Sequence, residues 1–99
     1  MDINWVNGQY AEDTRLFDSL HEAYEWTDSL YQDFSHSFYR RERVGYATPD
    51  EKVIDYLTDF LPEWASFINV QVNVHKEKLR VSDNFIFRIW VTYNDEDLG

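Results

Sequence analysis

Between Leu16 and Tyr39 the chain reads LFDSLHEAYEWTDSLYQDFSHSFY, with apolar residues recurring at spacings of three and four. At about 100° per residue, side chains with this spacing share one side of a helix. The acidic residues project from the opposite side, and no Lys or Arg interrupts them. The pattern predicts one long amphipathic helix over residues 14–39, with a buried stripe made of Leu16, Phe17, Leu20, Ala23, Tyr24, Leu30, Tyr31, Phe34 and Phe38.

The end of this helix is predicted between residues 40 and 44. Arg40, Arg41 and Arg43 lie there, and positive charge suits the negative end of the helix dipole. Gly45 adds a stop signal of the kind that follows many helices. We interpret the three arginines as helix-end charge in preference to a phosphate or carboxylate site.

A second, shorter helix is predicted over residues 49–61. Thr48 suits a helix N-cap, Pro49 suits the first helical position, and Glu51 is placed to complete a capping box. Pro62 disfavours helical geometry at the residue before it, so the helix should end there. Its expected buried stripe consists of Val53, Tyr56, Leu57, Phe60 and Leu61.

The last third of the chain changes to a period of two, which is typical of strands. Residues 67–75 alternate valine and isoleucine with polar side chains, and residues 85–93 repeat the alternation with a less polar second face. Residues 79–81 either form a short strand or continue the first one. Residues 3–6 could add another strand ahead of the Asn7-Gly8 turn signal.

These elements predict an α+β fold, in which one long and one shorter helix pack on a small C-terminal antiparallel sheet of two or three strands. With 99 residues, 43% of them hydrophobic, the chain suits one domain spanning residues 1–99. It has no cysteine, no internal repeat and no run of apolar residues long enough for a membrane span. We therefore expect a complete, soluble, cytoplasmic chain without a membrane partner.

The charge distribution is the strongest functional signal in the sequence. The formal net charge is −10, from 19 acidic and 9 basic residues, so direct binding of DNA or RNA is disfavoured. A basic protein surface would instead be attracted. Exposed helix faces are often acidic for solubility alone, so a purely solvated face is the alternative interpretation.

Carboxylates three or four positions apart on a helix lie about 5–6 Å from each other, close to the spacing of phosphates along a nucleic-acid strand. The acids of both helices have such spacings, and a partly exposed Trp is a frequent interface anchor. The expected partner-binding residues are Asp18, Glu22, Glu25, Asp28, Asp33 and Trp26 in the first helical region and Asp50, Glu51, Asp55 and Asp59 around the second.

Catalytic and metal-binding motifs are absent from the sequence. His21, His36 and His75 lack metal-ligand spacing, no serine lies in a nucleophile motif, and the three glycines form no phosphate loop. The absence of such motifs favours a protein that is not an enzyme and needs no metal or cofactor. Trp26 and Trp90 are the tryptophans expected to be partly exposed.

In size, charge and lack of catalytic motifs, the chain is similar to small acidic inhibitors of phages and mobile elements, such as anti-restriction and anti-CRISPR proteins. That similarity implies a non-enzymatic nucleic-acid mimic that binds a basic nuclease or another DNA- or RNA-handling protein. An immunity protein or antitoxin for a toxin nuclease is the first alternative. A small enzyme or carbohydrate-binding module is an alternative of another class.

Overall fold

The computed structural model describes residues 3–6 and 16–93. Within these residues, three helices and four strands follow one another in the order β1, α1, α2, β2, α3, β3, β4. The strands are β1 (Asn4–Trp5), β2 (Val44–Thr48), β3 (Val72–Val81) and β4 (Asn84–Tyr93), and the helices are α1 (Leu20–Asp28), α2 (Tyr31–Tyr39) and α3 (Glu51–Ser66).

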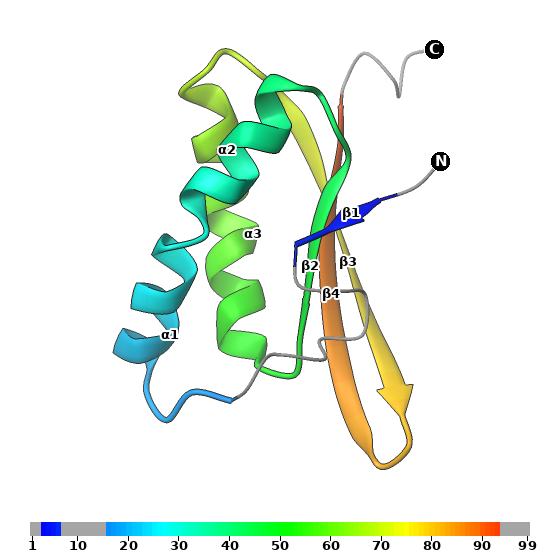
Figure 1. Cartoon of the computed structure of the whole chain (residues 1–99). Coiled ribbons are helices and arrows are strands. Elements are labelled where there is room, and N and C mark those ends of the chain that lie inside the picture. The colour runs from blue at the N-terminus through cyan, green and yellow to red at the C-terminus, as the bar shows by residue number, and fades with distance from the viewer. Residues whose placement is uncertain (1–2, 7–15, 94–99) are drawn as a thin grey trace.

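The helices form one layer and the sheet forms another, with all three helices on the same side of the sheet (Figure 1). The strand order is β1-β2-β4-β3, with β1 parallel to β2 and the other neighbours antiparallel. The predicted α+β class is therefore confirmed. The expected sheet of two or three C-terminal strands is wrong, because it has four strands, is mixed, and includes residues from the N-terminal half.

The predicted long helix is a helical region that bends between α1 and α2. The predicted start at residue 14 is wrong, because residues 16–19 are not helical and α1 begins at Leu20 with Ser19 as its N-cap. At the bend, the Leu30 N–H donates to the Thr27 carbonyl at 3.0 Å, a bond three residues back that tightens the turn. The Ser29 hydroxyl also donates a hydrogen bond to the Trp26 carbonyl at 2.5 Å, which competes with the backbone hydrogen bonds of the helix.

The stop signal for α2 is Arg41 rather than Gly45. Arg41 has a left-handed backbone with φ of 55°. The Arg41 N–H bonds to the Phe38 carbonyl and the Glu42 N–H to the Ser37 carbonyl, both at 3.0 Å, which is the Schellman pattern. Gly45 lies inside β2 instead.

The predicted N-cap of α3 is also wrong, by two residues. Asp50 caps the helix, and its carboxylate accepts the Lys52 N–H at 3.0 Å. The Thr48 hydroxyl accepts the Asp50 N–H at 3.1 Å and so shapes the approach to the cap.

The predicted end of α3 at residue 61 is wrong as well, because the helix continues through Pro62 to Ser66. Proline removes one backbone donor and disfavours this geometry. Burial of Trp64 and Ala65 in the core offsets that cost.

The β3–β4 hairpin confirms a strand over residues 85–93 and corrects the other predicted boundary. Residues 67–71 precede β3, and Asn69 adopts a left-handed backbone that closes the end of α3. The strand then runs without interruption to Val81, which pairs with Asn84 across a turn at Ser82 and Asp83. Residues 79–81 are thus a continuation of one strand.

Strand β2 had no counterpart among the predicted elements. All five of its residues are buried, so the alternation of apolar and polar side chains that marks a half-buried strand is absent. Asn4 and Trp5 pair beside it as β1, within the segment 3–6 that was open to being a strand. The Asn7-Gly8 signal lies outside the described residues.

The core lies between the helices and the helix-facing side of the sheet. Its largest fully buried side chains are Tyr46, Tyr93, Phe34, Phe38, Leu57, Leu61 and Ile89.

The other face of the sheet is partly covered by Trp5, which lies over Gly45. The Trp5 ring packs edge-on against Trp90 with centroids 6.2 Å apart, and the Arg88 guanidinium lies 5.3 Å from the Trp5 ring centroid. Trp90 also stacks on His75 at 5.6 Å. Trp90 is half-buried, which agrees with the prediction that it is partly exposed.

Candidate partner-binding surface

The outward sides of α1 and α3 carry exposed acidic residues that we name the acidic helix surface. It comprises Glu22, Glu25, Asp28, Glu51, Asp55, Asp59 and Glu63. Among the described residues, the only ion pair on this surface joins His21 Nε2 to Glu25 Oε1 at 3.1 Å. Glu63 was missing from the sequence-based set because α3 was expected to end before Pro62.

The two helices lie side by side, so their acids belong to one surface. Tyr24 of α1 packs against Tyr56 of α3 with ring centroids 4.7 Å apart, and the Tyr56 hydroxyl donates a hydrogen bond to Asp28. Partial burial, together with the negative charges of Asp28 and Glu63, raises the pKa of Tyr56 to about 12. Asp28 and Glu63 therefore act on the same phenol from different helices.

An aromatic seam runs between α3 and the other two helices. The Tyr56 ring stacks on Phe60 at 4.4 Å, and Tyr31 meets both Trp64 at 5.3 Å and Phe67 at 6.4 Å. Phe67 is 61% exposed and Tyr24 is 38% exposed. The sequence-based prediction placed Leu16, Leu20, Tyr24, Tyr31, Tyr56 and Phe60 in buried stripes. This is wrong for Leu16 and Leu20, which are 65% and 55% exposed, and the four aromatic rings are only partly covered. The four rings lie at the borders of the predicted stripes, and the three tyrosines carry a hydroxyl group. Both features indicate partial rather than full burial.

Trp26 lies on the side of α1 where Glu22 and Glu25 also project. With Phe17 and Ser29, these residues line an open hollow of about 490 Å³ that we name the Trp26 hollow. The indole is 42% exposed, as predicted, and its Nε1–H donates to the hydroxyl of buried Tyr46 at 2.9 Å. Burial raises the pKa of Tyr46, and the hydrogen bond from Trp26 opposes that shift.

Asp50 does not share this surface. It is 1% exposed, and its carboxylate accepts the N–H groups of Lys52 at 3.0 Å and Phe17 at 2.7 Å. Lys52 Nζ lies 3.1 Å from the same carboxylate. These contacts occupy the Asp50 side chain within the protein, so we leave it out of the proposed surface. Asp18 is exposed just before the Ser19 cap of α1.

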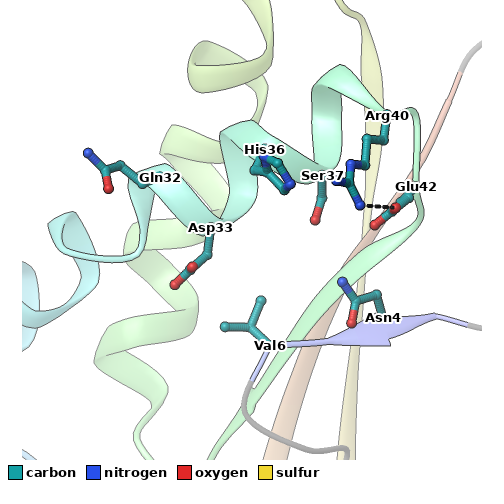
Figure 2. A pocket seen from close by; sticks show the side chains of 8 residues that line it. All are labelled: Asn4, Val6, Gln32, Asp33, His36, Ser37, Arg40 and Glu42. Carbon is teal, nitrogen blue, oxygen red and sulfur yellow. Dashed lines mark ion pairs between the residues drawn. The ribbon is translucent and has the colours of Figure 1, made fainter.

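Asp33 faces a different hollow, of about 540 Å³, between α2 and β1. Figure 2 shows Asp33 projecting from α2 at one end of the hollow, while Arg40 and Glu42 form an ion pair with N···O of 3.6 Å at the other end. His36 of the same hollow lies one helical turn beyond Asp33. Here basic and acidic groups are mixed, so this hollow lacks the uniform charge of the acidic helix surface.

Within residues 3–6 and 16–93, no three acidic or histidine side chains are grouped so that they could hold a metal ion. None of the helices described is long and apolar enough to cross a membrane. Comparisons of the chain with protein-family models, curated proteins and solved structures found no match.

Proposed function

We propose that this protein is a non-enzymatic inhibitor whose acidic helix surface occupies the basic nucleic-acid-binding surface of a nuclease or another DNA- or RNA-handling protein. One observation carries the proposal: α1 and α3 present seven exposed carboxylates, and only one of them has an ion-pair partner among the described residues. Carboxylates that have no ion-pair partner among residues 3–6 and 16–93 are available to a cationic partner.

The arrangement suits imitation of a phosphate backbone. Asp55 and Asp59 are one turn apart on α3, and Glu22 and Glu25 are three residues apart on α1, spacings of about 5–6 Å between Cβ atoms. Exposed aromatic side chains accompany these acids, since Tyr24 and Trp26 project from the same helix. Charges at the edge of an interface mainly increase the association rate, whereas aromatic anchors slow dissociation.

The partner can be found by affinity capture from the cells that encode this protein, followed by mass spectrometry. We expect the captured protein to bind nucleic acid, and adding this chain should release a labelled oligonucleotide from it. A co-encoded toxin nuclease as the sole partner would instead identify an immunity protein or antitoxin. A captured protein that does not handle nucleic acid would contradict the proposal.

Two variants of equal charge test whether the helix surface itself is responsible. Asp55→Asn combined with Asp59→Asn removes two charges from α3. Glu77→Gln combined with Asp83→Asn removes two charges from the hairpin β3–β4. The first variant should associate more slowly with the captured partner and show a shallower salt dependence, whereas the second should resemble the wild type. Equal effects would mean that only net charge matters.

A further inference from the structure

The Trp26 hollow combines an aromatic face with negative charge at one place. Its lining holds two rings, Phe17 and Trp26, and two carboxylates, Glu22 and Glu25. The ring centroids lie 6.2 Å apart with 34° between the planes. An aromatic face attracts cations through its quadrupole, and Trp does so more strongly than Tyr or Phe.

The indole of Trp26 is held in position before any partner arrives. Its Nε1–H is fixed on the Tyr46 hydroxyl at 2.9 Å, and Tyr46 belongs to the buried core. This bond orients the ring while 42% of the residue stays exposed. A ring that is already ordered loses little conformational entropy on binding.

The two carboxylates are placed to accept hydrogen bonds from a bound cation. The described residues contain no cation within ion-pair distance of Glu22, and the only one near Glu25 is His21, on an exposed pair. An exposed pair of this kind contributes little and is readily displaced. A free phosphate or the phosphodiester of a nucleic acid would be repelled by the two carboxylates.

We propose that the Trp26 hollow receives an arginine side chain of the partner, with the guanidinium plane over the indole and its N–H groups on Glu22 and Glu25. Arginine fits better than lysine because a planar guanidinium stacks on a ring and donates two parallel hydrogen bonds to a carboxylate. The inference rests on the proposed function, since it names the chemistry of the partner at one part of its surface.

Acetylated hexa-arginine and hexa-lysine amides are suitable probes. Titration of the ¹⁵N-labelled wild-type protein should move the indole N–H signal of Trp26 with hexa-arginine much more than with hexa-lysine. Calorimetry should show hexa-arginine binding roughly two- to fivefold more tightly. This measurement on the wild-type protein does not depend on the folding of any variant.

Three variants then separate the ring from the hydrogen bond. Trp26→Leu and Trp26→Phe both lose the bond to Tyr46, but only Trp26→Leu loses the aromatic face. Trp26→Leu should therefore abolish the preference for hexa-arginine, and Trp26→Phe should keep part of it. Tyr39→Leu removes a ring that is 72% exposed beside Arg40, and it should change nothing.

Equal binding of the two peptides that weakens with salt would overturn the arginine site while leaving the proposed function standing. An unmoved Trp26 signal during hexa-arginine binding would overturn it in the same way. If neither peptide bound at low salt, both the arginine site and the electrostatic basis of the proposed function would fail.

Discussion

At the scale of single residues, Asp28 and Tyr56 join the acidic helix surface to the aromatic seam. The phenol of Tyr56 donates to the Asp28 carboxylate, so one carboxylate both faces solvent and links α1 to α3. Partial burial, the hydrogen bond to Asp28 and neighbouring negative charge all oppose ionisation of this phenol, and together they raise its pKa to about 12 from an ordinary value of 10.0. Stability at alkaline pH should report on this contact.

Tyr56→Phe should lower the free energy of unfolding at pH 8 by about 0.5–1.5 kcal/mol, the range for one hydrogen bond. The fold favours the neutral phenol, so its stabilisation is present below pH 10 and is lost as pH rises toward 12. The variant should therefore lose less stability than the wild type over that interval. Urea unfolding at several pH values would detect this difference, with Tyr39→Phe at an exposed position as the control. Parallel plots of the free energy of unfolding against pH for the wild type and Tyr56→Phe would contradict the prediction.

Glycine is required at position 45 because the Trp5 ring lies against its backbone, and not because the chain turns there. A Cβ at this position would lie 2.6 Å from Cζ3 of Trp5 and 3.0 Å from the Ile89 carbonyl oxygen. Gly45→Ala should destabilise the fold by about 1–3 kcal/mol, because the methyl group displaces the indole. Combining it with Trp5→Ala should cost less than the sum of the single changes. Additive costs in a double-mutant cycle would show that the indole is not what restricts this position.

At the scale of elements, α3 depends on Asp50 at its start. Asp50→Ala should lower the free energy of unfolding by about 2 kcal/mol or more, because the helix cap is lost and the Phe17 N–H loses the carboxylate oxygen that accepts it at 2.7 Å. Asp50→Asn keeps an acceptor for the cap and should cost less. Thermal or urea unfolding distinguishes the two, and Asp50→Asn should leave binding to the captured partner intact. A binding defect in a stably folded Asp50→Asn protein would return Asp50 to the partner-binding surface.

Pro62 lies on the exposed side of α3, four residues after Thr58. Pro62→Ala would restore an N–H for the Thr58 carbonyl and remove the ring clash in the helix interior. We expect the free energy of unfolding to rise by about 1–3 kcal/mol, measurable by urea titration. Unchanged or lower stability would mean that the backbone around Pro62 has adapted to the ring.

The β3 edge illustrates a different use of charge. Lys76, Lys78 and Arg80 alternate along it and are exposed. Two such strands pairing with each other would bring like charges together, a common protection of an open sheet edge.

At the scale of the whole molecule, the net charge of −10 governs which partners can approach. The protein should have no measurable affinity for DNA or RNA at physiological salt, because its field repels phosphate. Fluorescence anisotropy with labelled single- and double-stranded oligonucleotides checks this expectation. Submicromolar binding would show that the basic residues at the end of α2 or along β3 outweigh the total charge.

The sequence by itself determined the helical character of residues 20–39, the second helix, the strand over residues 85–93 and the α+β class. These features follow from local periodicity, because a repeated apolar spacing has only one side on which to be buried. Exposure of Glu22, Glu25, Asp55 and Asp59 was predictable for the same reason, and Trp26 was recognisable at the border of the apolar stripe.

Only the tertiary structure decided the features that join distant residues. Strand β2 is buried throughout, so it carries no alternation to recognise, and α3 passes Pro62 because Trp64 fills the core beyond it. Asp50 is buried, and its carboxylate accepts a hydrogen bond from the N–H of Phe17, 33 residues away in the chain. Likewise, the aromatic seam forms from rings of different helices, as where Tyr24 of α1 meets Tyr56 of α3. Packing sets these features, since the free energy of burying a side chain depends on its neighbours in space rather than in sequence.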